Sequence, residues 1–209
     1  MAQVEDQSLK TIQYITPGLL GWAIATGATF GAALTLVTWR QKKILRRLRL
    51  SPVRTPAIVS ARVGVSIGVA LVQTAIFIGV AVVPYFGLKL SNYWWMSIPL
   101  VVAGTLAFMA IGLLAGAWAK TVESATAAAN LIVLPMAFLS GSFFPLDNAP
   151  TWLRQLSEVF PLRHLVTAMQ DVMVRGKGPE SVLPELGLLV AFAAVLAGVA
   201  AWVFRWDDV

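Results

Sequence analysis

Five stretches of this sequence are long and apolar enough to cross a lipid bilayer as helices. The hydrocarbon core of a bilayer is about 30 Å thick, and a helix needs roughly 20 apolar residues to cross it. The five stretches occupy residues 17–39, 63–83, 94–119, 125–140 and 182–204. Charged residues make up only 12% of the 209 residues, against roughly 25% in soluble domains. The sequence therefore predicts one all-α membrane domain over residues 1–209, with about five transmembrane helices.

The positive charges are concentrated in one segment, which predicts how the helices are oriented. Half of the sixteen Lys and Arg residues lie between positions 40 and 62. Basic loops stay on the cytoplasmic side, so this loop is expected inside and residues 142–181 outside. On this arrangement the inner segments carry ten Lys or Arg and the outer segments six. We expect a multi-pass protein of the cell membrane. Residues 1–16 then fall outside, which predicts an additional helix upstream.

Patterns that carry chemistry are absent from the sequence. It has no cysteine, so it offers no thiolate nucleophile and no Cys-based metal site. It contains no glycine-rich nucleotide loop and no His-Glu metal motif. Its one histidine, His164, has no Ser and Asp partners spaced for nucleophilic work, and is expected on a helix surface. We predict that the chain is not an enzyme by itself and holds no cofactor or metal.

The basic loop contains a short amphipathic pattern. Ile44, Leu45 and Leu48 recur at i, i+1 and i+4, with basic residues on the other faces, as in a helix. Ser51 ends the run because the residue before a proline avoids helical dihedral angles. Such a helix can simply hold the loop inside and touch anionic headgroups. It can also dock a cytoplasmic partner, and composition alone favours the first interpretation. The apolar helices on both sides argue against nucleic acid.

Residues 142–181 predict a pair of short amphipathic helices. The first carries an apolar stripe from Trp152 to Phe160, and Pro161 ends it. The second runs from Leu162 towards Arg175-Gly176, where glycine is a common helix stop. Both are too short and too polar to span. We expect them in the outer interface or dipping into it as a re-entrant hairpin, either as a surface lid or as a lining of an exit path.

Small residues recur at helical spacing in three of the five stretches. The pairs are Gly27 with Gly31, Gly64 with Gly68, and Gly112 with Gly116. Such pairs let helix backbones approach closely in lipid. They predict packing within this chain or, as a second possibility, a helix seam against a second subunit.

Several motifs together carry a resemblance that covers nearly the whole chain. Residues 45–53 read Leu-Arg-Arg-Leu-Arg-Leu-Ser-Pro-Val, and residues 139–145 read Leu-Ser-Gly-Ser-Phe-Phe-Pro. Residues 150–153 and 160–162 follow as Pro-Thr-Trp-Leu and Phe-Pro-Leu. This set resembles the permease subunit of the ABC-2 type exporter family, including the daunorubicin-resistance-like drug exporters. The family pattern has six spans, and residues 14–20 resemble the start of its second. A Glu common near the start of the coupling loop is replaced here by Thr38-Trp39-Arg40.

The resemblance implies the roles of both loops. Residues 40–56 would form the cytoplasmic coupling loop, with the ATPase-coupling positions Lys43, Ile44, Leu45, Arg46, Arg47, Leu48, Arg49, Leu50, Ser51 and Pro52. Residues 142–181 would form the outer helical hairpin. The outer re-entrant signature would comprise Leu139, Ser140, Gly141, Phe143, Phe144, Pro145, Pro150, Trp152, Leu153, Pro161 and Leu162.

The resemblance also implies partners. Two permease subunits, identical or different, would form the pathway, surrounded by membrane lipid. Separate ABC ATPase subunits, holding ATP and Mg, would dock under the coupling helices and drive export of an amphipathic drug or lipid-like substrate, as in multidrug resistance. The alternative is a non-transporting membrane scaffold or regulatory subunit. A scaffold need not co-purify with an ATPase.

Overall fold

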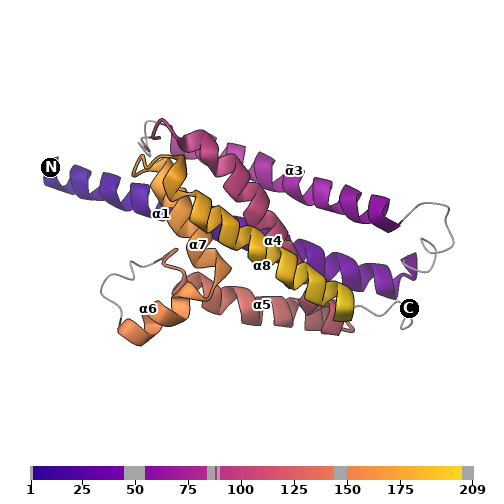
Figure 1. The fold of residues 1–209 in the computed structure, drawn as a ribbon. Coiled ribbons are helices and arrows are strands. Elements are labelled where there is room, and N and C mark those ends of the chain that lie inside the picture. The colour runs from indigo at the N-terminus through magenta and orange to yellow at the C-terminus, as the bar shows by residue number, and fades with distance from the viewer. Residues whose placement is uncertain (1, 45–54, 84–87, 89, 144–149, 204–209) are drawn as a thin grey trace.

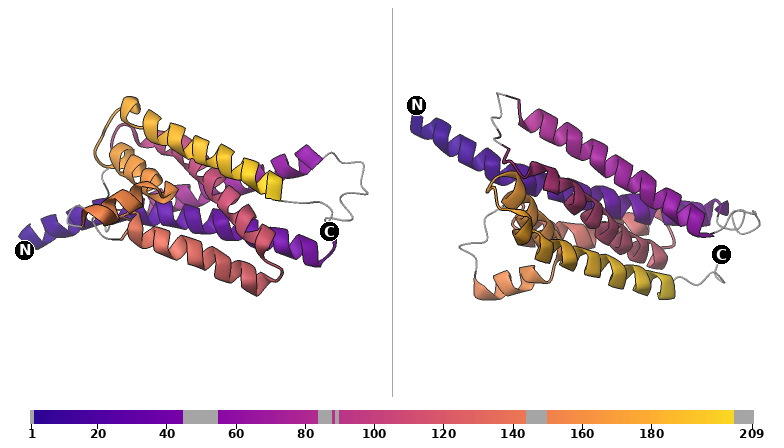
Figure 2. Two further views of the ribbon diagram at one scale, coloured as in Figure 1. Left: turned by 60° about the horizontal axis from the view of Figure 1, so that its bottom comes forward. Right: turned by 45° about the horizontal axis from the view of Figure 1, so that its top comes forward.

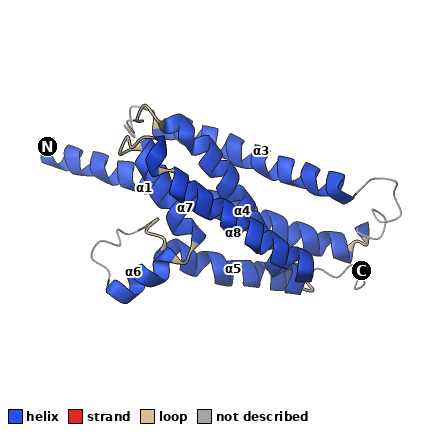
Figure 3. Ribbon diagram, viewed as in Figure 1, coloured by secondary structure: helices blue, strands red, loops and turns tan. Residues whose placement is uncertain are grey.

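A computed structural model describes residues 2–44, 55–83, 88, 90–143 and 150–203. Over these residues the chain is helical and contains no strand (Figures 1 and 3). The long helices are α1 (Ala2–Gln41), α3 (Thr55–Ala81), α4 (Ser97–Trp118), α5 (Val122–Leu139) and α8 (Leu183–Val203). The shorter ones are η1 (Trp94–Met96), α6 (Thr151–Glu158), α7 (Pro161–Met173) and η3 (Pro179–Ser181).

The all-helical membrane fold predicted from the sequence is confirmed. Within the described ranges, five helical segments are long and apolar enough to cross a membrane. They are Gln13–Gln41, Ala57–Ala81, Trp94–Trp118, Val122–Leu139 and Pro179–Ala200. The cytoplasmic coupling helix and the re-entrant character of the hairpin stay predictions.

Helix α1 is much longer than the apolar stretch that predicts its span. It begins at Ala2 and continues through Pro17, whereas the apolar stretch begins at residue 17. The preceding segment is polar but rich in residues that favour helix, such as Ala, Gln, Glu and Lys. Hydropathy therefore marks where lipid begins, not where the helix begins. In Figure 1 the first turns of α1 project beyond the other helices.

Helix α4 is the centre of the bundle. In its most apolar stretch 67% of the residues are buried, against 11% in the corresponding stretches of α3 and α8. Helices α1 and α8 pack along α4, and α3 contacts α1 and α4 less extensively. The three views show α4 crossing between its neighbours (Figures 1 and 2). Large parts of α3 and α8 are therefore free to face lipid or another chain.

The contact between α1 and α4 depends on glycine. A Cβ added at Gly112 would lie 2.2 Å from the carbonyl oxygen of Thr29, and one at Gly116 would lie 2.9 Å from that of Ala33. Two helix backbones touch there. For this pair, packing within the chain is confirmed. By contrast, no described atom lies within 4 Å of a Cβ built at Gly64 or Gly68.

The two ends of the bundle differ. At the loop end, α1 finishes, α3 begins and α4 passes into α5. At the hairpin end lie α6 and α7, together with the start of α8 (Figures 1 and 2). The end of α1 and the start of α3 thus lie at the opposite end of the bundle from α6 and α7 (Figure 1).

Candidate functional site

Of the predicted coupling positions, only Lys43 and Ile44 fall within the described residues, at the loop end of the bundle. Helix α1 ends in a turn where Lys43 is exposed and has a φ of 54°, a left-handed conformation. Ile44 follows and is half-buried. The remaining coupling positions, 45–52, lie outside the described residues, so the docking helix stays a prediction.

Arg62 ties α3 to α1 just after this loop. Its Nη2 donates to the carbonyl oxygen of Gly31 at 2.6 Å and to Oγ1 of Thr35 at 2.8 Å. Arginine inside a membrane helix is costly unless it is paired. Both acceptors lie on α1 and are bonded by Nη2, whereas the buried Nε has no hydrogen-bond partner among the described residues. The helices on either side of the loop are thus joined by a charge-assisted contact. The sequence places Arg62 at the end of the basic loop and does not indicate this contact.

The first part of the outer signature is a packing turn that closes α5 onto α1. Gly141 adopts a φ of 78°, which glycine tolerates without strain. Its carbonyl oxygen accepts from the Tyr14 hydroxyl at 2.7 Å. A Cβ at Gly18 would lie 2.5 Å from the carbonyl oxygen of Ser142. Ser140 and Ser142 share a buried hydroxyl–hydroxyl contact of 2.6 Å.

An aromatic contact extends this turn. The rings of Phe143 and Trp22 meet edge to face with centroids 5.6 Å apart, a favourable arrangement. Leu139 is half-buried beside it. Phe144 and Pro145 lie outside the described residues. The described part of the signature therefore joins α5 to α1 and carries no reactive group.

The second part of the signature separates an exposed helix from a buried one. Pro150 precedes α6, on which Trp152 is 64% exposed and Leu153 is half-buried. Pro161 then opens α7, where proline fits because the first helical N–H needs no partner. Leu162 is fully buried.

Helix α7 is inserted into the bundle. A Cβ at Gly21 on α1 would meet Val166, and one at Gly104 on α4 would meet Leu165, each at 2.9 Å. A surface helix would leave its polar side in solvent, but Gln170 is also buried. Helix α7 is thus part of the core, and only α6 has the exposure expected of a surface lid. Whether the pair lines a path stays a prediction.

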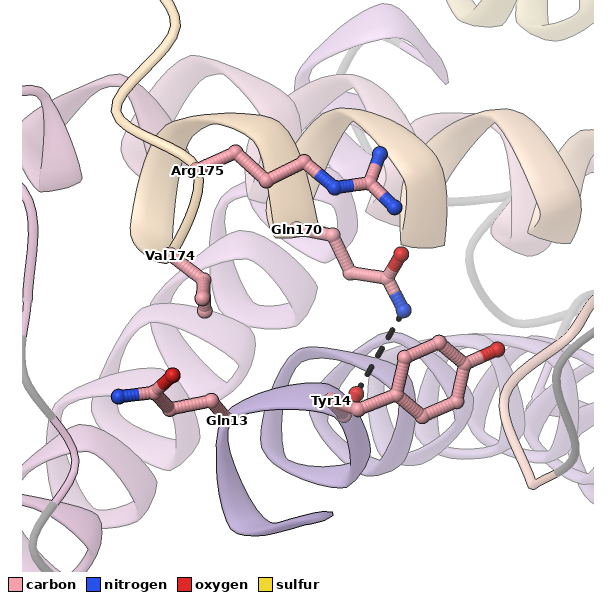
Figure 4. Close-up of a pocket in the computed structure, with 5 residues that line it drawn as sticks. All are labelled: Gln13, Tyr14, Gln170, Val174 and Arg175. Carbon is pink, nitrogen blue, oxygen red and sulfur yellow. Dashed lines mark hydrogen bonds between the residues drawn. The ribbon is translucent and has the colours of Figure 1, made fainter. Parts of the chain in front are cut away.

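Asp171 closes the end of α7. Its carboxylate, 9% exposed, accepts from Arg175 and from Lys177, each at 2.8 Å. A shallow depression of about 140 Å³ lies next to it, lined by Gln13, Tyr14, Gln170, Val174 and Arg175 (Figure 4). Gln170 donates across it to the carbonyl oxygen of Tyr14 at 3.5 Å. Pockets for drug-sized ligands usually enclose about 300–1,000 Å³, so this depression is small for such a ligand.

His164 is not a free surface residue, contrary to the expectation from sequence. Its side chain is 14% exposed, and Nδ1 lies 2.5 Å from Oε2 of Glu185 on α8. Its Nε2 lies 2.8 Å from the carbonyl oxygen of Glu158 at the end of α6. One imidazole thus joins α6, α7 and α8.

We expect His164→Ala to destabilise the hairpin end by about 1–3 kcal/mol, because it leaves partly buried acceptors unpaired. The thermal unfolding midpoint of the purified protein measures this. The partnership is isolated by a double-mutant cycle with Glu185→Ala, in which the two losses should not add. Gln155→Ala, on the exposed face of α6, is the control. Additive losses would show that the contact contributes nothing.

The fold is that of a multi-pass membrane protein, with five helices long enough to span and one buried helix that is too short. The sequence matches the ABC-2 type transporter family over residues 2–174. The chain therefore belongs to the ABC-2 type transporter family.

The chain is similar in sequence to several bacterial permeases, at low identity. The chain is 24% identical over 196 residues to the probable multidrug ABC transporter permease YbhR of Escherichia coli K12, covering 92% of this chain and 52% of YbhR. It is 24% identical over 199 residues to the inner membrane transport permease YadH of the same strain, covering 94% and 73%. It is 28% identical over 117 residues to the linearmycin resistance permease protein LnrN of Bacillus subtilis 168, covering 52% and 30%. The chain thus matches only about half the length of YbhR.

Proposed function

We propose that this chain is the permease subunit of an ATP-driven exporter that moves an amphipathic, drug-like or lipid-like molecule across the cytoplasmic membrane. The family match over residues 2–174 is the observation that carries the proposal. The names of YbhR and LnrN, a multidrug permease and a resistance permease, support drug export. The permease itself performs no bond chemistry: it would bind its substrate in one state and release it from another.

Hydrolysis belongs to a separate partner in this proposal. ABC ATPase subunits, with ATP and Mg, dock at positions 43–52 on the cytoplasmic side. The apolar residues of this segment enter a groove of the ATPase, and its basic residues steer the approach.

A second permease subunit completes the pathway. The exposed surfaces of α3 and α8, and the open space beside Gly64 and Gly68, support a contact with such a subunit.

The cytoplasmic placement of the basic loop can be tested by labelling, since the chain has no cysteine of its own. Lys42 and Gln155 are exposed at opposite ends of the bundle, whereas Ser157 is buried. We expect an impermeant thiol reagent to label Gln155→Cys in intact cells and Lys42→Cys only after the cells are broken. Labelling of Lys42→Cys alone in intact cells would reverse the orientation.

Export itself is tested by drug sensitivity. A strain lacking this permease should be more sensitive to at least one amphipathic antibiotic or detergent of a broad panel. The same sensitivity should follow when the P-loop lysine of the partner ATPase is replaced. Unchanged sensitivity to the whole panel, in a strain where the complex is expressed and hydrolyses ATP, would argue against drug export.

A further inference from the structure

The last turn of α1 is fixed to the junction between α4 and α5. Arg40 Nη1 donates to the carbonyl oxygen of Ala119 at 3.0 Å, and Gln41 Nε2 donates to that of Lys120 at 3.4 Å. Both acceptors belong to the segment between α4 and α5, and Ala119 is the residue that ends α4. A cation at a helix C-terminus is favourable because unpaired carbonyl groups give that end a partial negative charge.

A small apolar cluster lies next to these hydrogen bonds. Its members are all buried: Ala33 and Val37 on α1, Ala115 on α4, Ala119 directly after α4, and Ala125 on α5. Small side chains leave the three helices close to one another. The start of α5 is also held firmly, since Thr121 and Ser124 cap it reciprocally. The end of α1 and the α4–α5 junction are therefore built as one body.

The position of this body in the chain gives it a mechanical role. Arg40 and Gln41 are the last residues of α1, and the coupling positions begin two residues later. A displacement of the N-terminal end of the coupling loop therefore acts on the turn of α1 that holds Arg40 and Gln41. Because their partners are backbone carbonyl groups, the displacement is passed to the whole junction and not to one mobile side chain.

We infer that Arg40 and Gln41 are positioning residues that transmit movement of the coupling loop to α4 and α5. This inference rests on the proposed function, in which an ATPase displaces the loop. Arg40 is the stronger of the two, because its bond is shorter and charge-assisted. We call the pair the junction clamp.

The test is a spin-label distance measurement in the complete complex with its ATPase, reconstituted in lipid. Labels at Lys42→Cys and Glu123→Cys, both exposed, report the separation of the end of α1 from the start of α5. The distance is measured without nucleotide and after trapping with ATP and vanadate. With the clamp intact, the distance distribution should be the same in both states. In Arg40→Ala, trapping should shift the distribution by more than its width, because the end of α1 then moves without the junction.

Matched variants separate transmission from folding. Gln41→Ala should shift the distance distribution in the same direction as Arg40→Ala, but by less. Arg40→Lys keeps a charged donor and should also give a smaller shift than Arg40→Ala. Lys120→Ala removes a nearby charge but keeps the carbonyl acceptor, and should behave as the parent. A nucleotide-dependent distance in the parent, or an unchanged distance in Arg40→Ala, would overturn the inference. If no ATPase binds or no vanadate-trapped state forms, the proposed function fails instead.

Discussion

Replacing Leu45 and Leu48 together by alanine is expected to leave the protein in the membrane but to disconnect it from ATP hydrolysis. The two leucines, with Ile44, have the spacing of an apolar stripe in the proposed coupling segment. Apolar anchors at the centre of a helix-in-groove interface commonly contribute about 2 kcal/mol or more each when truncated. Loss of both should weaken ATPase association by at least about a hundredfold.

The basic residues around the stripe should matter much less. Exposed charges are screened and contribute little to affinity, so Arg46→Ala is the matched single control. Subunit association is measured by pull-down, and coupling by substrate-stimulated ATP hydrolysis, using a compound from the sensitivity panel. Full association and full stimulation in the double variant would contradict the docking role. The basic loop would then serve only to set the orientation of the helices in the membrane.

Replacing Gly112 by alanine is expected to cause the largest loss of stability among the described glycine positions, because its added Cβ would make the shortest contact with backbone. The added methyl group would lie 2.2 Å from the carbonyl oxygen of Thr29 and 2.9 Å from the Cβ of Ala32. Backbone cannot give way as a flexible side chain can, so α1 and α4 must separate. Overpacking of this kind typically costs about 1–3 kcal/mol, and here it acts on the central helix.

Gly79→Ala is the control for this substitution, because no described atom lies within 4 Å of its added Cβ. Both changes replace glycine by alanine inside a helix, so they share the same gain in helix propensity. The thermal unfolding midpoint in detergent should fall for Gly112→Ala only. Equal midpoints would show that the backbone contact between α1 and α4 contributes nothing to stability.

Local pattern was sufficient to predict the spans. Because a bilayer fixes the length of apolar helix that crosses it, each of the five stretches coincides broadly with a helix of the structure. The start of α1 at Ala2 could not be predicted in this way, since hydropathy does not report the helicity of polar residues.

The burial of α7 could not be read from the sequence, because its apolar stripe resembles that of a surface helix. Its apolar stripe is buried because Leu165 and Val166 fit against glycines of α4 and α1. The polar residue Asp171 can be buried as well because it is paired with Arg175 and Lys177. The spacing of four residues between Asp171 and Arg175 fits an ion pair on one helix, but it does not indicate that Asp171 is buried. The pairing of His164 with Glu185 was not, since only the fold brings α7 and α8 together.

At the loop end, too, part of the structure could be predicted from the sequence and part could not. Sequence predicted a coupling loop, and the small-residue pairs predicted close helix packing. Nothing in the sequence indicated that Arg40 and Gln41 donate to Ala119 and Lys120, because those residues are far apart in the chain. Every residue has a backbone carbonyl group, so the type of the acceptor residue does not indicate such a contact.

The most direct test of the proposed function is purification of the native complex from its own membrane, with identification of the associated subunits. An exporter permease should co-purify with a P-loop ATPase, and the Leu45→Ala, Leu48→Ala variant should lose that ATPase while remaining in the membrane. A permease that is isolated intact and stably associated with other membrane proteins, but never with an ATPase, would contradict the proposal and favour a scaffold.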